Sequence, residues 1–158
     1  MSLIDSIDLR ILKILQEKGK ITNIQLSQEI GLSPAPTLER VKKLETSGMI
    51  KSYHAVVNAQ KLGLGFSALI QISLTRQIAN AIKNFTKAIG DIPEIIQCLQ
   101  VTGNFDYQLY VIVKDIPAFE RLIADKLSKI EEIGQMQTQV VLSVIKDSKI
   151  LPVEYKGK

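Results

Sequence analysis

The chain has 158 residues, 46% hydrophobic and 23% charged, with a formal net charge of +4 and a pI of about 9.1. These are ordinary globular proportions, which exclude a mostly disordered chain, and the positive excess is compatible with nucleic-acid binding. A single cysteine, Cys98, excludes an internal disulfide, and no run approaches the roughly 20 apolar residues of a membrane span. Without a leader pattern either, the sequence predicts a soluble cytoplasmic protein that binds no membrane.

Three short helices are predicted in the first 48 residues. The first has Asp5 as its N-cap and Asp8 three residues later. Its apolar face consists of Ile4, Ile7, Ile11, Leu12 and Leu15. In the second helix Thr22 and Gln25 form a capping box, and Gly31 ends the helix.

Only "GLS" separates the second helix from a third, which begins with two prolines in "SPAPTLERVKKLE". Proline costs little there, because the first N–H groups of a helix have no partner within it. We expect the Ser33 hydroxyl to cap this helix. Its inward side is predicted to be Leu38, Val41, Leu44 and Glu45. Two short helices joined by a short turn with glycine are typical of a helix-turn-helix, which we assign to residues 1–50.

If the third helix enters the major groove of double-stranded DNA, its first turns face the base edges. Arg40 would pair with guanine, Glu39 would accept from cytosine, and Ala35 and Pro36 would meet a thymine methyl. The predicted base-reading group is Ala35, Pro36, Thr37, Glu39 and Arg40, and the predicted phosphate-contacting group is Asn23, Gln25, Lys42, Lys43 and Lys51. Ser33, at the start of the helix, is also predicted to lie at the DNA interface. The alternative is that the lysines form an ordinary solvated helix face.

Residues 51–65 are predicted to connect two domains. The pattern from Ile50 to Asn58 favours a short strand, and "AQKLGLG" a hinge. "GLGFSA" also matches a loose dinucleotide-binding motif. We reject that interpretation, because such glycines follow a strand and open a helix, whereas these precede a strand.

Residues 66–158 alternate strand and helix patterns. A strand over 66–75 is followed by a helix with Ile78, Ile82, Phe85 and Ile89 on one face. The strands "EIIQCLQVT" and "YQLYVIVK" are joined by "GNFD". A helix from Ile116 to Ile130 and a strand near Met136 to Ile145 complete the order βαββαβ. This is the ferredoxin-like arrangement, so the fold class is α+β, with an antiparallel sheet that carries both helices on one face.

The other face of that sheet has no remaining element of the chain to cover it. Several strands nevertheless place apolar residues on both sides, among them Leu69, Ile96, Cys98, Tyr110, Ile112, Val141 and Ile145. A second copy of the protein is the expected cover, which predicts a homo-oligomer.

The stretch "LIDSIDLRILKILQEKGKITNIQLSQEIGLSPAPTLERVKKLETSGMIKSYHAVVN" resembles the helix-turn-helix end of the Lrp/AsnC regulators. "QVTGNFDYQLYV", within a βαββαβ unit, resembles their regulatory (RAM) domain. The resemblance implies a DNA-binding, nucleoid-associated transcription factor that is dimeric through that domain and often octameric. It also implies a small effector, an amino acid such as leucine, held between regulatory domains.

The resemblance also implies which residues hold the effector, with Asp106 suited to its ammonium group. The implied set is Gln100, Thr102, Gly103, Asn104 and Asp106 around the loop, with Thr138, Gln139 and Val140 on the last strand. The alternative is a simple hairpin turn, which "GNFD" would form in any protein.

Other function classes fit less well. The two central strands lack the glycine-aromatic signature of an RNA-recognition module. His54 is expected to be a surface or hinge residue and Cys98 a small buried hydrophobe, so we expect no enzyme, no metal site and no cofactor. Two rivals stay open: an architectural protein that wraps DNA without an effector, and an amino-acid sensor that acts through protein partners.

Overall fold

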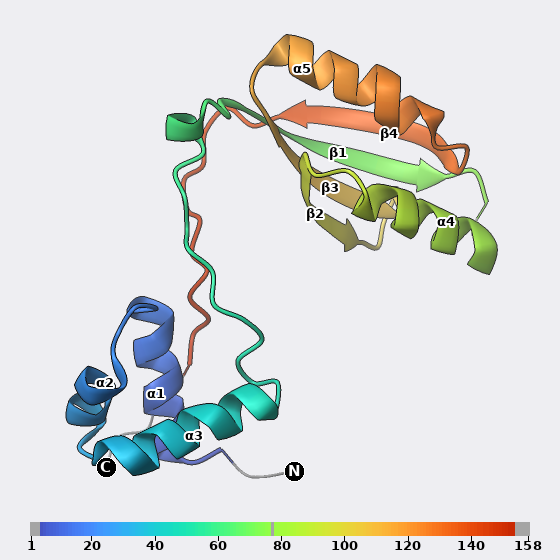
Figure 1. Ribbon diagram of the computed structural model, residues 1–158. Coiled ribbons are helices and arrows are strands. Elements are labelled where there is room, and N and C mark those ends of the chain that lie inside the picture. Colours follow the sequence, from blue (N-terminus) through green and yellow to red (C-terminus); the bar gives the residue numbers. More distant parts are fainter. Residues whose placement is uncertain (1–3, 77, 154–158) are drawn as a thin grey trace. The chain divides into compact units, whose positions relative to one another are not determined.

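The computed structural model describes residues 4–76 and 78–153 and divides into two compact units. The first comprises Met1–Val57 with Lys146–Lys158, and the second comprises Asn58–Ile145. Figure 1 shows the helices of the first unit in blue to teal and the sheet of the second in green to red. These units differ from the expected domains 1–50 and 66–158, because the last segment of the chain belongs with the helical unit.

The first unit contains its three helices in the predicted order: α1 (Ser6–Glu17), α2 (Asn23–Ile30) and α3 (Pro34–Thr46). The predicted N-cap at Asp5 and the predicted capping box at Thr22 are confirmed, and Asp5 also forms a capping box with Asp8. The Asp5 carboxylate accepts from the Asp8 N–H at 2.8 Å, and the Thr22 hydroxyl accepts from the Gln25 N–H at 3.2 Å. Gly31 ends α2 with a φ of 76°, a left-handed conformation that suits glycine and allows the tight turn into α3.

A small apolar core holds the three helices together. Its buried side chains are Ile11 and Ile14 from α1, Leu26 and Ile30 from α2, and Leu44 from α3. Each such side chain stabilises the fold by about 1.5 to 3 kcal/mol on burial. So few of them give a unit of modest stability, which makes each further contact between the helices matter.

The inward side of α3 differs from the predicted one. Thr37 is fully buried on the same side as Val41 and Leu44, whereas Leu38 is 42% exposed. Thr37 tolerates burial because its hydroxyl donates to the Ser33 carbonyl at 2.9 Å, which satisfies its polar group. The predicted hydroxyl cap is wrong: Ser33 stands at the N-cap position, but its side chain makes no capping hydrogen bond.

The strand predicted between Ile50 and Asn58 is absent. Residues 51–57 are neither helix nor strand, and no ladder joins them to another described segment, which a strand requires. A short 3₁₀ turn, η1 (Gln60–Leu62), follows and ends at Gly63 with a φ of 77°. The predicted hinge therefore contains one folded turn.

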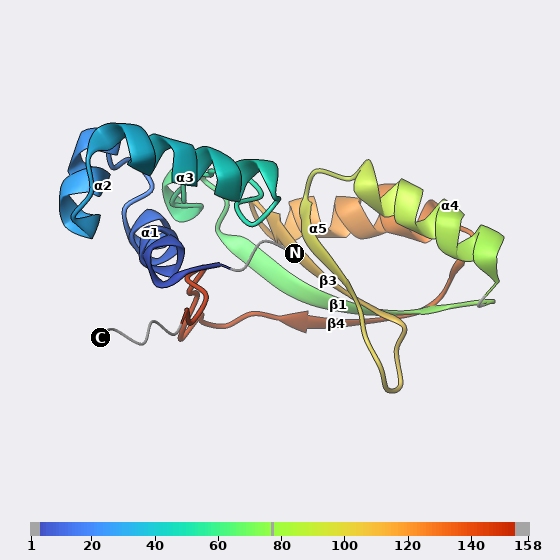
Figure 2. The ribbon, with the colours of Figure 1, turned by 90° about the horizontal axis from the view of Figure 1, so that it is seen from below.

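The second unit has the predicted βαββαβ order. Its elements are β1 (Phe66–Leu74), α4 (Ala79–Gly90), β2 (Ile95–Gln100), β3 (Tyr107–Val113), α5 (Ile116–Arg121) and β4 (Ile133–Val140). The strands lie in the order β2-β3-β1-β4, and every neighbouring pair is antiparallel. Both helices cover the same face of the sheet (Figures 1 and 2). The ferredoxin-like arrangement is thus confirmed, although β4 begins and ends earlier than predicted.

The core of this unit lies between the sheet and its helices. It is built from alternate residues of β1 and β3 together with side chains of the helical segments, chiefly Ala68, Ile70, Ile72, Leu109, Val111, Phe85 and Leu122. The Phe85 ring lies 4.6 Å from the Tyr107 ring, centroid to centroid, which ties α4 to β3.

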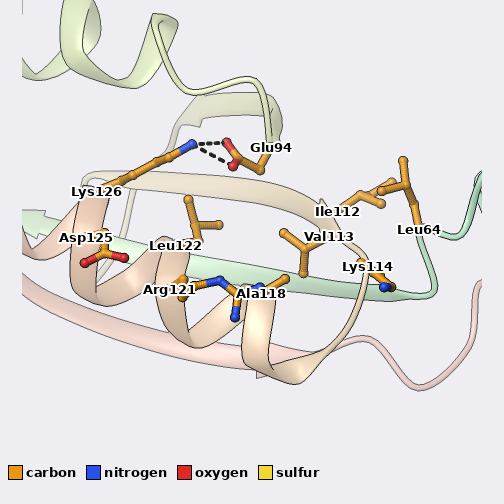
Figure 3. A pocket seen from close by; sticks show the side chains of 10 residues that line it. All are labelled: Leu64, Glu94, Ile112, Val113, Lys114, Ala118, Arg121, Leu122, Asp125 and Lys126. Carbon is orange, nitrogen blue, oxygen red and sulfur yellow. Dashed lines mark hydrogen bonds and ion pairs between the residues drawn. The ribbon is translucent and has the colours of Figure 1, made fainter.

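The predicted helix from Ile116 to Ile130 is not one regular α-helix. After α5 the chain makes a wider π-helical turn, η2 (Leu122–Lys126), and then a 3₁₀ turn, η3 (Leu127–Lys129). Lys126 pairs with both carboxylate oxygens of Glu94, at 2.6 and 2.8 Å, as Figure 3 shows. The Lys126 ammonium group beside Glu94 lowers the pKa of that carboxyl.

The opposite face of the sheet is formed by the remaining alternate residues and has an unusual number of amides. Gln137, Gln71 and Gln108 form one row across β4, β1 and β3. Gln139, Leu69 and Tyr110 form the next row. We call these six residues the outer-face rows. They mix polar amides with two large apolar side chains on a face that no helix of the unit covers.

Candidate nucleic-acid interface and effector site

The exposed side of α3 forms the candidate nucleic-acid interface. Its exposed residues are Ala35, Pro36, Leu38, Glu39, Lys42 and Lys43. The start of this helix is fixed in place by α2, because the Asn23 amide donates to the Pro34 carbonyl at 2.8 Å. A proline-stiffened, apolar helix end is thus presented outward on a rigid support, as a side that enters a DNA groove requires.

Three lysines lie in the C-terminal half of α3 and just beyond its end, at positions 42, 43 and 51. Lys42 lies 3.6 Å from the Glu39 carboxylate, and both side chains are more than half exposed, so that pair is weak. Lys43 and Lys51 are exposed and form no ion pair within the described residues. Their ammonium groups therefore have no competing internal anion and are available to phosphates.

Arg40, a predicted base-reading residue, has ion-pair partners within its own unit. Its Nη1 lies 2.7 Å from Asp5 Oδ2 and 2.7 Å from Asp8 Oδ1, so it joins α3 to the first turn of α1. The Asp8 side chain is only 4% exposed and needs such a partner. Hydrogen bonds to both carboxylates raise the pKa of Arg40, while the Asp8 N–H and Arg40 together lower the pKa of Asp5. The structure thus engages Arg40 inside the unit.

Three other predicted residues also have internal partners. Thr37 is fully buried and does not reach the surface. The side-chain Oε1 of Gln25 accepts from the Thr22 N–H at 3.1 Å within the capping box. The Asn23 side-chain amide donates to the Pro34 carbonyl. Ser33 is exposed but provides only its backbone to the start of α3. The sequence did not indicate that Leu38 lies on the candidate reading face, where it is exposed beside Ala35. Its spacing from Val41 and Leu44 is that of a buried helix side, so the sequence pattern predicted burial.

The loop after β2 is held firmly against the end of β1. The Asp106 N–H donates to the Ile72 carbonyl at 2.9 Å, and Asp106 Oδ2 accepts from the Leu74 N–H at 2.8 Å. The Ser73 hydroxyl donates to the Asn104 carbonyl at 3.3 Å. Gly103 has a φ of 120°, which residues with side chains rarely adopt. The loop therefore has one defined shape, with Asp106 serving as a structural staple.

The two predicted halves of the effector site lie apart within one chain. Thr138, Gln139 and Val140 lie on edge strand β4 and pair with three residues of β1, namely Ile70, Leu69 and Ala68. The loop is bonded instead to the last residues of β1, from Ile72 to Leu74. Gln100 pairs with Tyr107 at the opposite edge of the sheet. The predicted effector residues of one chain are therefore distributed over the loop and both edge strands of the sheet.

The comparisons with known proteins agree with this architecture. Residues 67–151 match the Lrp/AsnC ligand binding domain, and residues 4–51 match a winged helix-turn-helix DNA-binding domain. The leucine-responsive regulatory protein of Haemophilus influenzae is 38% identical over 148 residues, which cover 94% of this chain and 89% of that protein. The chain belongs to the Lrp/AsnC family. It is therefore a transcriptional regulator with a DNA-binding and a ligand-binding domain, and not a member of an enzyme family.

Solved structures of Lrp/AsnC regulators have the same fold. A transcriptional regulator of Neisseria meningitidis, solved as a complex with L-methionine, has a TM-score of 0.90 and 35% identity and covers 95% of this chain and 97% of its own. AsnC of Escherichia coli has a TM-score of 0.84 and 25% identity and covers 94% of this chain and 98% of its own. The correspondence spans both units of this Lrp/AsnC chain.

A hollow of the ligand-binding unit lies on its helical side. It has a volume of about 410 Å³ and lies between α5, η2 and the end of β3 (Figure 3). Val113, Ala118 and Leu122 line it with apolar surface, and the Glu94–Lys126 pair spans one end. This hollow contains none of the residues that the family resemblance implies for the effector.

Cys98 and His54, which were expected to have no role in a site, both lie at the surface. Cys98 is exposed on edge strand β2, so the prediction that it is buried is wrong; partial burial still raises the pKa of its thiol. His54 is exposed, with its Nε2 atom 2.7 Å from the Ser52 hydroxyl. Within the described residues there is no cluster of metal-binding side chains, and no helix there is long and apolar enough to cross a membrane.

Proposed function

We propose that this protein is a homo-oligomeric, nucleoid-associated regulator that binds specific DNA sites through α3 and responds to an amino acid. The observation that carries the DNA part is the outward end of α3. There Ala35, Pro36, Leu38 and Glu39 lie exposed on the same helix as Lys43, which has no ion-pair partner among residues 4–76 and 78–153. In this proposal the apolar tip and Glu39 face the bases, whereas Lys42, Lys43 and Lys51 contact phosphates.

An amino acid is the proposed effector because the similar Neisseria regulator, 35% identical over nearly the whole chain, was solved with L-methionine. Leucine is the second candidate, because relatives 36 to 38% identical carry the name leucine-responsive regulatory protein. The proposed contacts are the loop residues Gln100 to Asp106 of one copy and Thr138, Gln139 and Val140 of another. The rigid loop would supply backbone groups of fixed direction to the amino and carboxylate ends.

The outer-face rows support assembly with a second copy. Leu69 and Tyr110 are only partly covered, and within the described residues of this unit no helix lies over their face of the sheet. The connecting segments also expose apolar side chains, among them Val56, Val57, Leu142 and Ile145. A twofold partner would cover both surfaces, and the glutamine amides can donate and accept across such an interface. Assembly of dimers into octamers would then bring the two halves of the effector site together.

The test is DNA binding of the purified full chain, measured by fluorescence anisotropy. The DNA is its own upstream region or a scrambled fragment of equal length, at two salt concentrations, with and without L-leucine or L-methionine. Sequence preference with a changed Kd in the presence of either amino acid supports the proposal. Sequence preference that no amino acid alters would favour the architectural alternative, and no preference at all would contradict the assignment of α3.

A further inference from the structure

The end of the chain is attached to α1 by one side chain. The Leu151 N–H donates to Gln16 Oε1 at 2.7 Å, and Gln16 Nε2 donates to the Leu151 carbonyl at 3.4 Å. One amide thus satisfies both backbone groups of Leu151, much as a neighbouring strand would. Gln16 lies in the last turn of α1, and 135 positions separate it from Leu151.

This attachment means that the chain joins the two units twice. It passes from the first unit to the second after Val57 and returns to the first at Lys146. On the side of the second unit, the Val141 N–H still donates to the Ser67 carbonyl at 3.0 Å, immediately after β4. The residues between Val141 and Leu151 therefore connect the end of β4 along the chain to the residue that Gln16 of α1 holds.

The returning segment is shaped locally and held weakly. Lys149 pairs with Asp147 at 2.6 Å, and the Ile150 N–H donates to the Ser148 hydroxyl at 3.2 Å. The side chains of Ile150 and Leu151 are largely exposed, so polar contacts rather than apolar burial hold the segment. Such an attachment can open and close under a small load, which a tightly packed helix cannot do.

We propose that residues 146–153 form a strap that transmits the state of β4 to the DNA-binding unit through Gln16. This rests on the proposed function, because β4 carries the proposed effector contacts Thr138, Gln139 and Val140. The strap holds the last turn of α1, while Arg40 of α3 holds the first turn through Asp5 and Asp8. The strap and the reading helix therefore act on opposite ends of one rigid helix. Gln16 is a positioning residue and touches neither DNA nor effector.

The first arm of the test measures the strap without DNA or effector. Amide hydrogen exchange at Leu151 is compared in the full-length wild type, in Gln16→Ala and in Lys13→Ala, a control at an exposed position of α1. Loss of about one hydrogen bond's worth of stabilisation should speed exchange at Leu151 roughly 5- to 10-fold in Gln16→Ala and leave Lys13→Ala unchanged. Equal exchange in all three proteins would overturn the attachment.

The second arm measures coupling as the ratio of the Kd values for DNA with and without the effective amino acid. Coupling of this kind is typically about 5- to 150-fold. Gln16→Ala should reduce the ratio at least about threefold while the Kd without effector stays within about twofold. A ratio equal to that of wild type and Lys13→Ala would overturn the transmission. If wild type itself shows a ratio of one, the proposed amino-acid response fails and the transmission with it, while the exchange arm still decides the attachment.

Discussion

Arg40 of α3 lies 2.7 Å from the carboxylate of Asp8 in α1, and the Asp8 side chain is 4% exposed. A charge so well buried needs a partner, and the small apolar core of this unit leaves little stability to spare. The same guanidinium also reaches Asp5, the N-cap of α1. Arg40 therefore helps to fix the orientation of α3 relative to α1.

Replacement of Arg40 should act mainly on stability. Arg40→Ala leaves Asp8 without its partner and should lower the unfolding free energy of the helical unit by about 1 to 3 kcal/mol, since the guanidinium is partly exposed. Urea denaturation followed by circular dichroism measures this. Lys42→Ala, on the exposed side of α3, is the control and should change stability by less than about 0.5 kcal/mol. A fully stable Arg40→Ala protein that loses preference at one base pair would restore the base-reading role.

The ion pair also predicts a pH dependence. The N–H of Asp8 and the charge of Arg40 lower the pKa of Asp5 below its ordinary value of 3.8. The stabilisation is therefore present above that ordinary value and is lost as the pH falls through the lower, folded value. The helical unit should lose stability below about pH 4 more steeply than Arg40→Gln. If the unfolding free energies of wild type and Arg40→Gln fall equally steeply with decreasing pH, the ion pair of Arg40 with Asp5 does not contribute to acid stability.

Lys43 should contribute to DNA affinity without regard to sequence. Its ammonium group is exposed and has no internal ion-pair partner within the described residues, so it can replace a condensed counterion on DNA. Lys43→Ala should weaken specific and scrambled DNA alike and reduce the slope of log K against log salt by about one. The control is Lys87→Ala, which removes an exposed lysine from α4 of the other unit. A slope that Lys43→Ala leaves unchanged would remove the phosphate contact.

A pair of variants separates the two possible roles of Asp106. Asp106→Asn keeps an oxygen for the Leu74 N–H but removes the charge, whereas Asp106→Ala removes both. If the carboxylate binds an ammonium group, Asp106→Asn should stay folded yet lose amino-acid binding by at least about tenfold in calorimetry. If Asp106 is only a staple, Asp106→Asn binds as wild type does and only Asp106→Ala loses thermal stability.

The outer-face rows should control the oligomeric state. Tyr110→Lys places an unpaired charge in the centre of the proposed interface, so the protein should elute as a monomer in size-exclusion chromatography with light scattering. Lys87→Glu, on the opposite face of the same unit, should leave the mass unchanged. An oligomer that survives Tyr110→Lys would place the interface elsewhere.

The features that the sequence predicted correctly are formed by residues close to one another along the chain. The N-cap at Asp5 and the capping box at Thr22 were predictable because each joins residues three positions apart, and β1 was predictable because its alternation is regular. The ion pair of Arg40 with Asp8 and the contact of Gln16 with Leu151 were not, because they join residues 32 and 135 positions apart. Because Thr37 is polar, the sequence predicted it on the exposed side of α3. It is buried instead, because its hydroxyl donates to the Ser33 carbonyl and so needs no water.

The most direct test of the whole account is the Kd for upstream DNA with and without L-leucine or L-methionine, measured by anisotropy against scrambled DNA. We expect tighter binding to the upstream fragment and a shift of that Kd by at least about fivefold with one of the amino acids. Equal affinity for both fragments, unaffected by either amino acid, would contradict it.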